Sequence, residues 1–184
     1  MIVRIDALGH RTETSYDAAG QVIRVTHPDG TTERTTYNAV GKVLTETDRA
    51  GRITSYTYDP LDRLLATTYP DGSSTSQTYD PAGRVHTTTD QLGNTTTTEY
   101  DKTGNVRFVT NALDETTEYT YTERGMLDLV IDPKGNITDH DYDARGFRTL
   151  TTLPDGTYLH AAYDRLGRLR NQTNQLKLLV ETSK

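Results

Sequence analysis

Cysteine and tryptophan are absent from this chain of 184 residues, and phenylalanine occurs only twice. Without cysteine there is no disulfide framework, which leaves the redox compartment open. Only 33% of the residues are hydrophobic, so an ordinary globular core is not expected. No apolar run approaches the roughly 18 residues of a membrane-spanning helix, and residues 1–8 lack the basic-then-apolar order of a signal peptide. We therefore expect neither a membrane span nor a signal peptide in this chain.

Basic residues are scattered along the chain rather than gathered into a stripe, and the formal net charge is -6 at pH 7. An acidic chain without a basic patch is a poor candidate for binding nucleic acid. Low hydrophobicity would also fit a disordered chain, but disordered chains are poor in aromatic and β-branched residues. This chain contains 12 tyrosines and is rich in threonine and valine, which favour strands. Ordered β-structure is therefore the better interpretation.

A tyrosine recurs every 21 residues and is the most regular feature of the chain. In six of the eight copies aspartate follows it, and in seven a glycine stands four residues later, with Asp62 as the exception. The unit reads Tyr-Asp-x-x-Gly-(Arg/Lys/x)-Val/Leu, and such self-similarity indicates one supersecondary unit stacked many times. The members of the two series are Tyr16, Tyr37, Tyr58, Tyr79, Tyr100, Tyr121, Tyr142 and Tyr163, and Gly20, Gly41, Gly83, Gly104, Gly125, Gly146 and Gly167.

A second glycine series has the same period and lies between the first ones. Its members are Gly9, Gly30, Gly51, Gly72, Gly93, Gly135 and Gly156, with Asp114 in the missing place. Aspartate can cap its own turn, proline presets φ, and glycine accepts the positive φ that closes a hairpin loop. Turns at alternating intervals of 11 and 10 residues leave strands of six or seven residues. We predict an all-β fold, an antiparallel meander of about 17 short strands built from β-hairpin repeats.

The odd length of the repeat constrains its loops. A three-residue bulged loop closed by glycine would pair Tyr16 with Val22 on one face. Because side chains alternate between faces, two identical loops in a 21-residue repeat would send successive tyrosines to opposite faces. Either the second loop differs in parity, or one strand carries a bulge. Asp29-Gly30 and its equivalents would suit a two-residue turn, and a four-residue loop would serve equally.

A single repeat is not expected to be stable alone. Burying one tyrosine removes about 150 to 250 Å² from water, worth roughly 4 to 6 kcal/mol, whereas ordering each residue costs about 1 to 2 kcal/mol. Neighbouring repeats must therefore share strands and a tyrosine layer.

The ends of the repeat pattern define the expected domain organisation. The array covers residues 1–173, with eight repeats in register after an N-terminal half repeat, and residues 174–184 form a degenerate terminal repeat or tail. Lys184 stands where a ninth tyrosine is due. The apolar stretch Leu176–Val180 fits either a capping strand or a chance tail. At least one sheet edge should be unprotected, which leaves self-association through edge strands open.

The Tyr-Asp-x-x-Gly-Arg-Leu/Val unit resembles the Rhs or YD repeat of bacterial Rhs polymorphic toxins, insecticidal toxin complex C components and teneurins. The resemblance covers residues 1 to about 173. It implies hairpins that wind into a spiral sheet, which closes as a hollow shell around a toxin or a C-terminal segment. Such shells have many more repeats, so this chain is expected to form a curved, open part of one. The resemblance also implies that the repeat tyrosines and glycines are structural anchors rather than catalytic groups.

No side-chain cluster in the sequence carries a convincing chemistry. The five histidines, His10, His27, His86, His140 and His160, occupy different phases of the repeat, and only His140 and His160 are candidates for a pair. The run Asp139, Asp141, Asp143 is similar to a calcium loop, but Ala144 and Leu150 replace its required glycine and glutamate. No nucleophile motif is present. We therefore expect no catalytic site, no metal and no cofactor.

Asp132-Pro133-Lys134-Gly135 has the letters of the self-cleavage segment that ends complete Rhs cores. It stands in phase with the other turns and a further repeat follows it, so we interpret it as an ordinary turn.

The sequence predicts a structural, non-catalytic segment of a toxin-encapsulating shell. Its partners would be the remainder of the shell or the toxin cargo, and its location secreted or cell-surface associated within a larger toxin. The alternative is a cell-surface carbohydrate-binding or adhesion module that uses Tyr56, Tyr119 and Tyr158 beside a threonine row. That row comprises Thr26, Thr47, Thr68, Thr89, Thr110, Thr152 and Thr173. A third reading is a self-cleaving or toxic enzyme.

Overall fold

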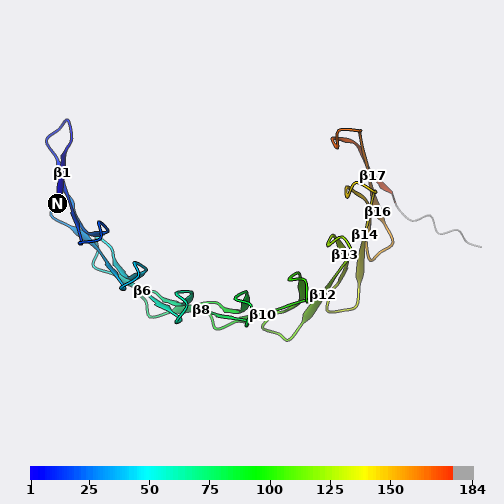
Figure 1. Cartoon of the computed structure of the whole chain (residues 1–184), viewed down its shortest axis with the longest axis horizontal. Helices are drawn as coiled ribbons and strands as arrows, with labels where there is room; N and C mark the ends of the chain where they lie inside the picture. Colours follow the sequence, from blue (N-terminus) through cyan, green and yellow to red (C-terminus); the bar gives the residue numbers. More distant parts are fainter. Residues whose placement is uncertain (176–184) are drawn as a thin grey trace, which may run out of the picture. The chain divides into compact units, whose positions relative to one another are not determined.

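The computed structural model describes residues 1–175, which form 17 β-strands and no helix (Figure 1). The chain divides into two compact units, and residue 95 is the last of the first unit. The first contains β1 (Ile2–Ile5), β2 (Arg11–Tyr16), β3 (Val22–Thr26), β4 (Thr32–Tyr37), β5 (Val43–Thr47), β6 (Ile53–Tyr58), β7 (Leu64–Thr68), β8 (Ser74–Tyr79) and β9 (Val85–Thr89). The second, with nearly all of β10 (Thr95–Tyr100), contains β11 (Val106–Thr110), β12 (Thr116–Tyr121), β13 (Leu127–Ile131), β14 (Ile137–Tyr142), β15 (Arg148–Thr152), β16 (Tyr158–Tyr163) and β17 (Leu169–Gln175).

Within each unit every strand pairs antiparallel with the next one along the chain. The predicted all-β antiparallel meander is therefore confirmed. We call a strand that ends in a repeat tyrosine a tyrosine strand, and the strand after it a return strand; β1 has the sequence phase of a return strand. A tyrosine strand and the return strand after it form a tyrosine hairpin, and a return strand and the tyrosine strand after it form a linking hairpin.

Both kinds of hairpin close through the same three-residue loop. In the first tyrosine hairpin, Asp17 N donates to Gln21 O at 3.0 Å and Gly20 N donates to Asp17 O at 3.2 Å. The linking hairpin after it repeats this pattern, since His27 N donates to Thr31 O at 2.9 Å. The suggestion of a two-residue or four-residue loop at the second turn is therefore wrong. The glycine position needs positive φ in both loops, and Asp62 and Asp114 adopt it with φ of 59° and 60°.

A β-bulge in each tyrosine hairpin absorbs the odd residue of the repeat. Tyr16 pairs with Val22 but Ser15 pairs with Arg24, so Ile23 is the extra residue on the return strand. A register shift occurs at the same place in all the other tyrosine hairpins. The linking hairpins have no shift. The bulge that the odd repeat length predicted as one of two solutions is therefore confirmed. It keeps successive repeat tyrosines of a unit on one face of the sheet, here called the tyrosine face.

No hydrophobic side chain among the described residues is fully buried; the buried ones are Thr67, His140 and Thr151. The sheet of each unit therefore has no core of its own and presents two accessible faces. All three buried residues lie on the tyrosine face, since Thr67 pairs with Tyr56 and Thr151 pairs with His140. The expected division at residue 174 falls inside β17, and Leu176–Val180 lies outside the described residues, so that division stays a prediction.

Candidate structural site: the tyrosine hairpins

The repeat tyrosines join consecutive hairpins through their hydroxyl groups. In the six pairs given next, the hydroxyl of a repeat tyrosine donates a hydrogen bond to the backbone carbonyl oxygen of the residue 15 positions earlier. The pairs, with donor first, are Tyr37 and Val22 at 2.9 Å, Tyr58 and Val43 at 2.8 Å, Tyr79 and Leu64 at 2.9 Å, Tyr121 and Val106 at 2.9 Å, Tyr142 and Leu127 at 2.7 Å, and Tyr163 and Arg148 at 3.1 Å.

Each acceptor carbonyl lies beside the bulge of the preceding tyrosine hairpin. Val22 is the first residue of β3 and pairs with Tyr16, whereas the register of β3 with β4 runs only from Arg24 to Thr26. Val22 is thus beyond the end of that ladder, and the Tyr37 hydroxyl supplies its carbonyl with a donor. Backbone carbonyls need such partners wherever regular pairing ends. The sequence did not predict this acceptor, although the constant 21-residue period implied a constant contact of some kind.

Aspartate after the tyrosine holds the loop of its own hairpin. Asp59 Oδ1 accepts hydrogen bonds from Leu61 N and Arg63 N, both at 2.9 Å, and Asp59 Oδ2 accepts from Arg63 Nε at 2.7 Å. The same arrangement recurs at Asp80 and Asp164. These side-chain bonds satisfy loop N–H groups that have no strand partner.

The residue after the glycine reaches over the loop of the next tyrosine hairpin. Gln21 Nε2 donates to Gly41 O at 3.1 Å. The Arg63 guanidinium lies 4.2 Å from the centre of the Tyr79 ring, in the geometry of a cation–π contact. This position carries a long side chain in every repeat except one, where it is Asn105, and that preference is the sequence signal that could have revealed the contact.

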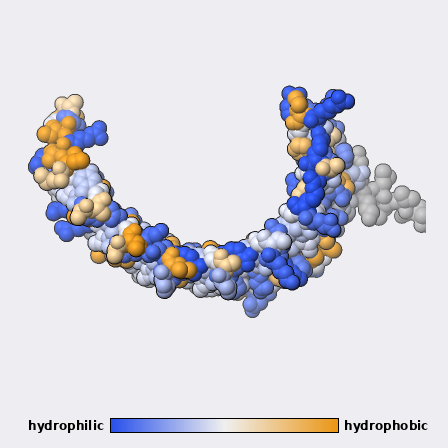
Figure 2. Space-filling model, in the orientation of Figure 1, coloured by the Kyte–Doolittle hydropathy of each residue, from blue (hydrophilic) through white to orange (hydrophobic). Residues whose placement is uncertain are grey.

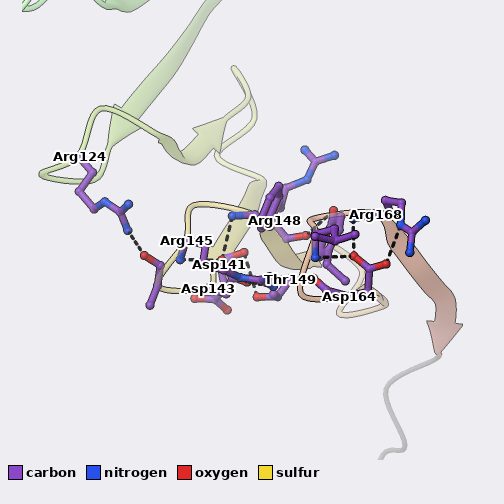
Figure 3. Close-up of polar contacts among 12 residues, drawn as sticks. Arg124, Asp141, Asp143, Arg145, Arg148, Thr149, Asp164 and Arg168 are labelled. Carbon is purple, nitrogen blue, oxygen red and sulfur yellow. Dashed lines mark hydrogen bonds and ion pairs between the residues drawn. The ribbon is translucent and has the colours of Figure 1, made fainter.

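Arginines in the loops of the second unit make a further link between repeats (Figure 3). Arg124 Nη1 donates to Ala144 O at 2.9 Å, and Arg145 Nη1 donates to Asp164 O at 2.8 Å. Arg145 also bonds Asp143 within its own loop at 2.7 Å. Phe147 stacks on the Tyr163 ring with centroids 5.0 Å apart. Tyrosine, aspartate, glycine and the residue after glycine therefore all contact either their own loop or the next one.

The loop aspartates make stability depend on pH. The Thr103 hydroxyl and backbone N–H groups lower the pKa of Asp101 to about 2, and the backbone N–H of Arg63 lowers the pKa of Asp59. Because these folded-state pKa values lie below the unfolded value of about 3.9, the unfolded chain binds more protons. The stabilisation is present above the unfolded pKa and is lost as pH falls through the folded values.

We therefore expect the free energy of unfolding to hold between about pH 7 and pH 5 and then to fall steadily toward about pH 2. Urea unfolding followed by circular dichroism at several pH values measures this. The Asp101→Asn variant is the matched control, since it should show a shallower decline. An unfolding free energy that does not change between pH 5 and pH 2 would contradict the role of these carboxylates.

The Asp132 carboxylate accepts hydrogen bonds from residues of its own turn, as the other loop aspartates do. Its Oδ1 accepts from Lys134 N at 2.9 Å and from Asn136 N at 2.8 Å, and its Oδ2 accepts from Asn136 Nδ2 at 2.7 Å. We expect the Asp132→Asn variant to give the same single band and intact mass as the parent chain, because asparagine can accept the same backbone bonds. A shortened product of the parent that disappears in the variant would show self-cleavage instead.

The structure separates the residues proposed for carbohydrate binding. Tyr56 and Tyr119 stand two residues before a repeat tyrosine and lie on the tyrosine face, whereas Tyr158 pairs with Thr152 on the opposite face. The threonine row also lies on that opposite face, where Thr89 and Thr110 bond threonines across a linking hairpin at 2.9 Å. Tyr56 in addition donates to Glu46 at 2.6 Å, which raises the pKa of Tyr56 to about 12. The hypothesis that these three tyrosines and the threonine row share one face of the sheet is therefore wrong.

The histidines and the acidic run are not brought together either. His140 is buried on the tyrosine face with Nδ1 3.1 Å from Thr151 Oγ1, and burial lowers its pKa. His160 pairs with Leu150 on the other face. Across residues 1–175 no group of three or more potential metal-binding side chains is found. In the same part of the chain, no helix has the length and apolar character needed to cross a membrane.

These contacts define a class of protein: a single-layer antiparallel β-repeat in which ring hydroxyls and loop side chains join each hairpin to the next. The chain belongs to the RHS Repeat family, whose model matches residues 2–32, 37–77 and 79–110. The family resemblance seen in the sequence is therefore confirmed. A search of curated protein sequences found no match to this chain.

Solved toxin structures share the fold. The crystal structure of TcdB2-TccC3 without its hypervariable C-terminal region superposes with a TM-score of 0.56 at 16% identity, covering 89% of this chain. The TcdB2-TccC3-Cdc42 crystal structure gives a TM-score of 0.53 at 16% identity and 89% coverage. The Tc holotoxin pore of Photorhabdus luminescens, with a TccC3 mutation, gives the same three values. In all three, this chain spans only 11% of the matched chain.

Proposed function

We propose that this chain is a structural, non-catalytic wall segment of a larger toxin-encapsulating shell. The observation that supports it most is the repeated bond from a tyrosine hydroxyl to a carbonyl of the preceding hairpin, as between Tyr58 and Val43. Where this bond is formed, one hairpin depends on its neighbour, which is how a repeat array extends in one dimension. This segment matches 11% of the toxin chain, so that chain is about nine times as long as the matched part.

The chemistry of the described surface fits a wall better than an active site. Six repeat-tyrosine hydroxyls and the loop carboxylates described above are engaged in bonds to the backbone, and the buried polar side chains of His140 and Thr151 bond each other. Groups held in this way position the chain rather than activate a substrate. As part of a secreted toxin, the segment would separate cargo from solvent without acting on it.

The test uses the gene product in which this segment occurs. We expect the coding sequence beside it to continue the Tyr-Asp repeat in the same phase. Limited proteolysis of that product should leave an enclosed cargo intact, and the Tyr58→Ala change should expose the cargo to cleavage. The Leu92→Ala variant, which changes an exposed loop side chain, is the control. Equal cargo cleavage in the parent and Tyr58→Ala products would count against a wall.

A glycan array on the folded chain separates this function from the adhesion module. The wall predicts no bound glycan. Saturable binding that is lost in the Tyr56→Ala variant would support the carbohydrate alternative instead.

A further inference from the structure

We propose that a pocket between the loops of two consecutive tyrosine hairpins in the second unit binds a guanidinium group, carried by an arginine side chain of another polypeptide. The two hairpins are β10–β11 and β12–β13. The inference goes beyond the proposed function, because a wall segment can enclose a space without binding any ligand at its loops.

The pocket measures about 660 Å³. Asp101, Thr103 and Asn105 line it from the loop of the first hairpin. Tyr121 lines it from the end of β12, and Glu123 lines it from the loop of the second hairpin. The pocket therefore combines an aromatic ring with carboxylates from two neighbouring repeats.

Short side chains leave this pocket open. One repeat later, Met126 stands in the place of Asn105 and Arg124 in the place of Thr103, and the gap that both line measures about 350 Å³. Arg124 bridges that gap, since its Nη1 donates to Ala144 O at 2.9 Å. Asn105 instead turns back to its own loop, where its Nδ2 donates to Thr103 Oγ1 at 2.9 Å. The larger pocket is thus the space that two longer side chains occupy in the next repeat.

The first unit shows which chemistry suits this place. Arg63 has the repeat position at which the pocket has its asparagine, and its guanidinium lies 4.2 Å from the centre of the Tyr79 ring. Its Nε and Nη2 also lie 2.7 Å from Asp59 Oδ2. Tyr121 and Asp101 occupy the same repeat positions as this ring and this carboxylate. Burial and the Asp101 charge raise the pKa of Tyr121, so the carboxylate lies close to that ring. A guanidinium between them would make a cation–π contact and a charge-assisted hydrogen bond.

The charge of the lining is complementary to a cation. Glu123 is the only acidic residue at its loop position in the eight tyrosine hairpins, where the others are alanine, proline, lysine or arginine. Arg107 is the one cation of the lining, and it lies 3.9 Å from Glu118, which also lines the pocket. Three carboxylates against one guanidinium leave the pocket negative. Figure 2 shows hydrophilic atoms along the stretch that Figure 1 labels β12.

An arginine side chain fits the pocket better than a lysine or a free amino acid. A planar guanidinium stacks on a ring while it bonds a carboxylate, whereas an ammonium is a compact point charge. Free arginine has a carboxylate of its own, which the acidic lining would repel. Arg63 and Arg124 both reach their gaps from a peptide backbone, as an arginine of a partner chain would.

NMR titration of the whole chain with N-acetyl-arginine N-methylamide tests the proposal. Saturable shifts should appear at Asn105, Tyr121 and Glu123. The citrulline analogue has the same shape without the charge and should bind at least about tenfold more weakly. The lysine analogue and free arginine should bind several-fold more weakly than the blocked arginine. No saturable shift, equal binding of the citrulline or the lysine analogue, or tightest binding of free arginine would overturn the proposal.

Four variants locate the binding. Asn105→Arg should weaken binding at least about tenfold, because its own guanidinium would take the place of the ligand. The matched Asn105→Ala variant keeps the pocket open and should bind as the parent does. Glu123→Gln should weaken binding about threefold, whereas Asp114→Asn removes a charge from a linking loop outside the pocket and should change nothing. Unchanged binding to Asn105→Arg, or equal losses in Glu123→Gln and Asp114→Asn, would overturn the proposed site.

Discussion

Replacing Tyr58 by alanine should lower the free energy of unfolding by about 3 kcal/mol, and replacing it by phenylalanine should lower it by about 1 to 2 kcal/mol. The Tyr58 hydroxyl donates to Val43 O at 2.8 Å, and the ring is half-buried between neighbouring repeats. Phenylalanine keeps the ring contacts but leaves the Val43 carbonyl without its donor. Urea unfolding followed by circular dichroism measures both changes.

Tyr16 provides the matched control for this prediction. Its hydroxyl lacks the partner that the others have, so Tyr16→Phe should change the free energy of unfolding by less than about 0.5 kcal/mol. Equal losses for Tyr16→Phe and Tyr58→Phe would mean that the hydroxyl affects stability by some route other than the carbonyl bond.

Gly167→Ala should cost about 2 to 3 kcal/mol, whereas Gly93→Ala should cost about 1 to 2 kcal/mol. Both glycines have positive φ, 79° at Gly167 and 85° at Gly93. A methyl group at Gly93 would meet open space, but at Gly167 it would lie 2.4 Å from the Phe147 ring. The ring would have to move and would weaken its stacking on Tyr163.

A double-mutant cycle separates the two causes. With Phe147→Ala in place, Gly167→Ala should cost no more than Gly93→Ala does, because only backbone strain remains. If the cost at Gly167 stays larger without the ring, then crowding by Phe147 is not the reason. Thermal and urea unfolding of the four chains provide the numbers.

The strands, their order and the positions of the turns could be predicted from the sequence because local chemistry determines them. A loop position that demands positive φ admits glycine and tolerates aspartate, and Asp62 and Asp114 both follow that rule. The face of Tyr158 was equally readable, since it stands an odd five residues before Tyr163. The carbohydrate-binding hypothesis places Tyr158 with Tyr56 and Tyr119 only because all three are aromatic.

The choice between a changed loop and a bulge could not be predicted from parity alone. Asp29-Gly30 suits a two-residue turn and also the end of a three-residue loop, and the hydrogen bond from Gly30 N to His27 O selects the second. The acceptor of each tyrosine hydroxyl was hidden for a related reason. The position of the acceptor carbonyl depends on the bulge and on the lateral distance between hairpins. Neither can be predicted from the spacing of residues in the sequence.

Amide exchange across the Tyr58→Phe variant tests most directly whether the tyrosines join consecutive hairpins. Tyr58 lies in the hairpin of β6 and β7, whereas Val43 belongs to the hairpin of β4 and β5. Exchange should quicken in both hairpins and stay unchanged in β1 and β2. Faster exchange confined to β6 and β7 would contradict the account, because each hairpin would then be stabilised by its own ring alone.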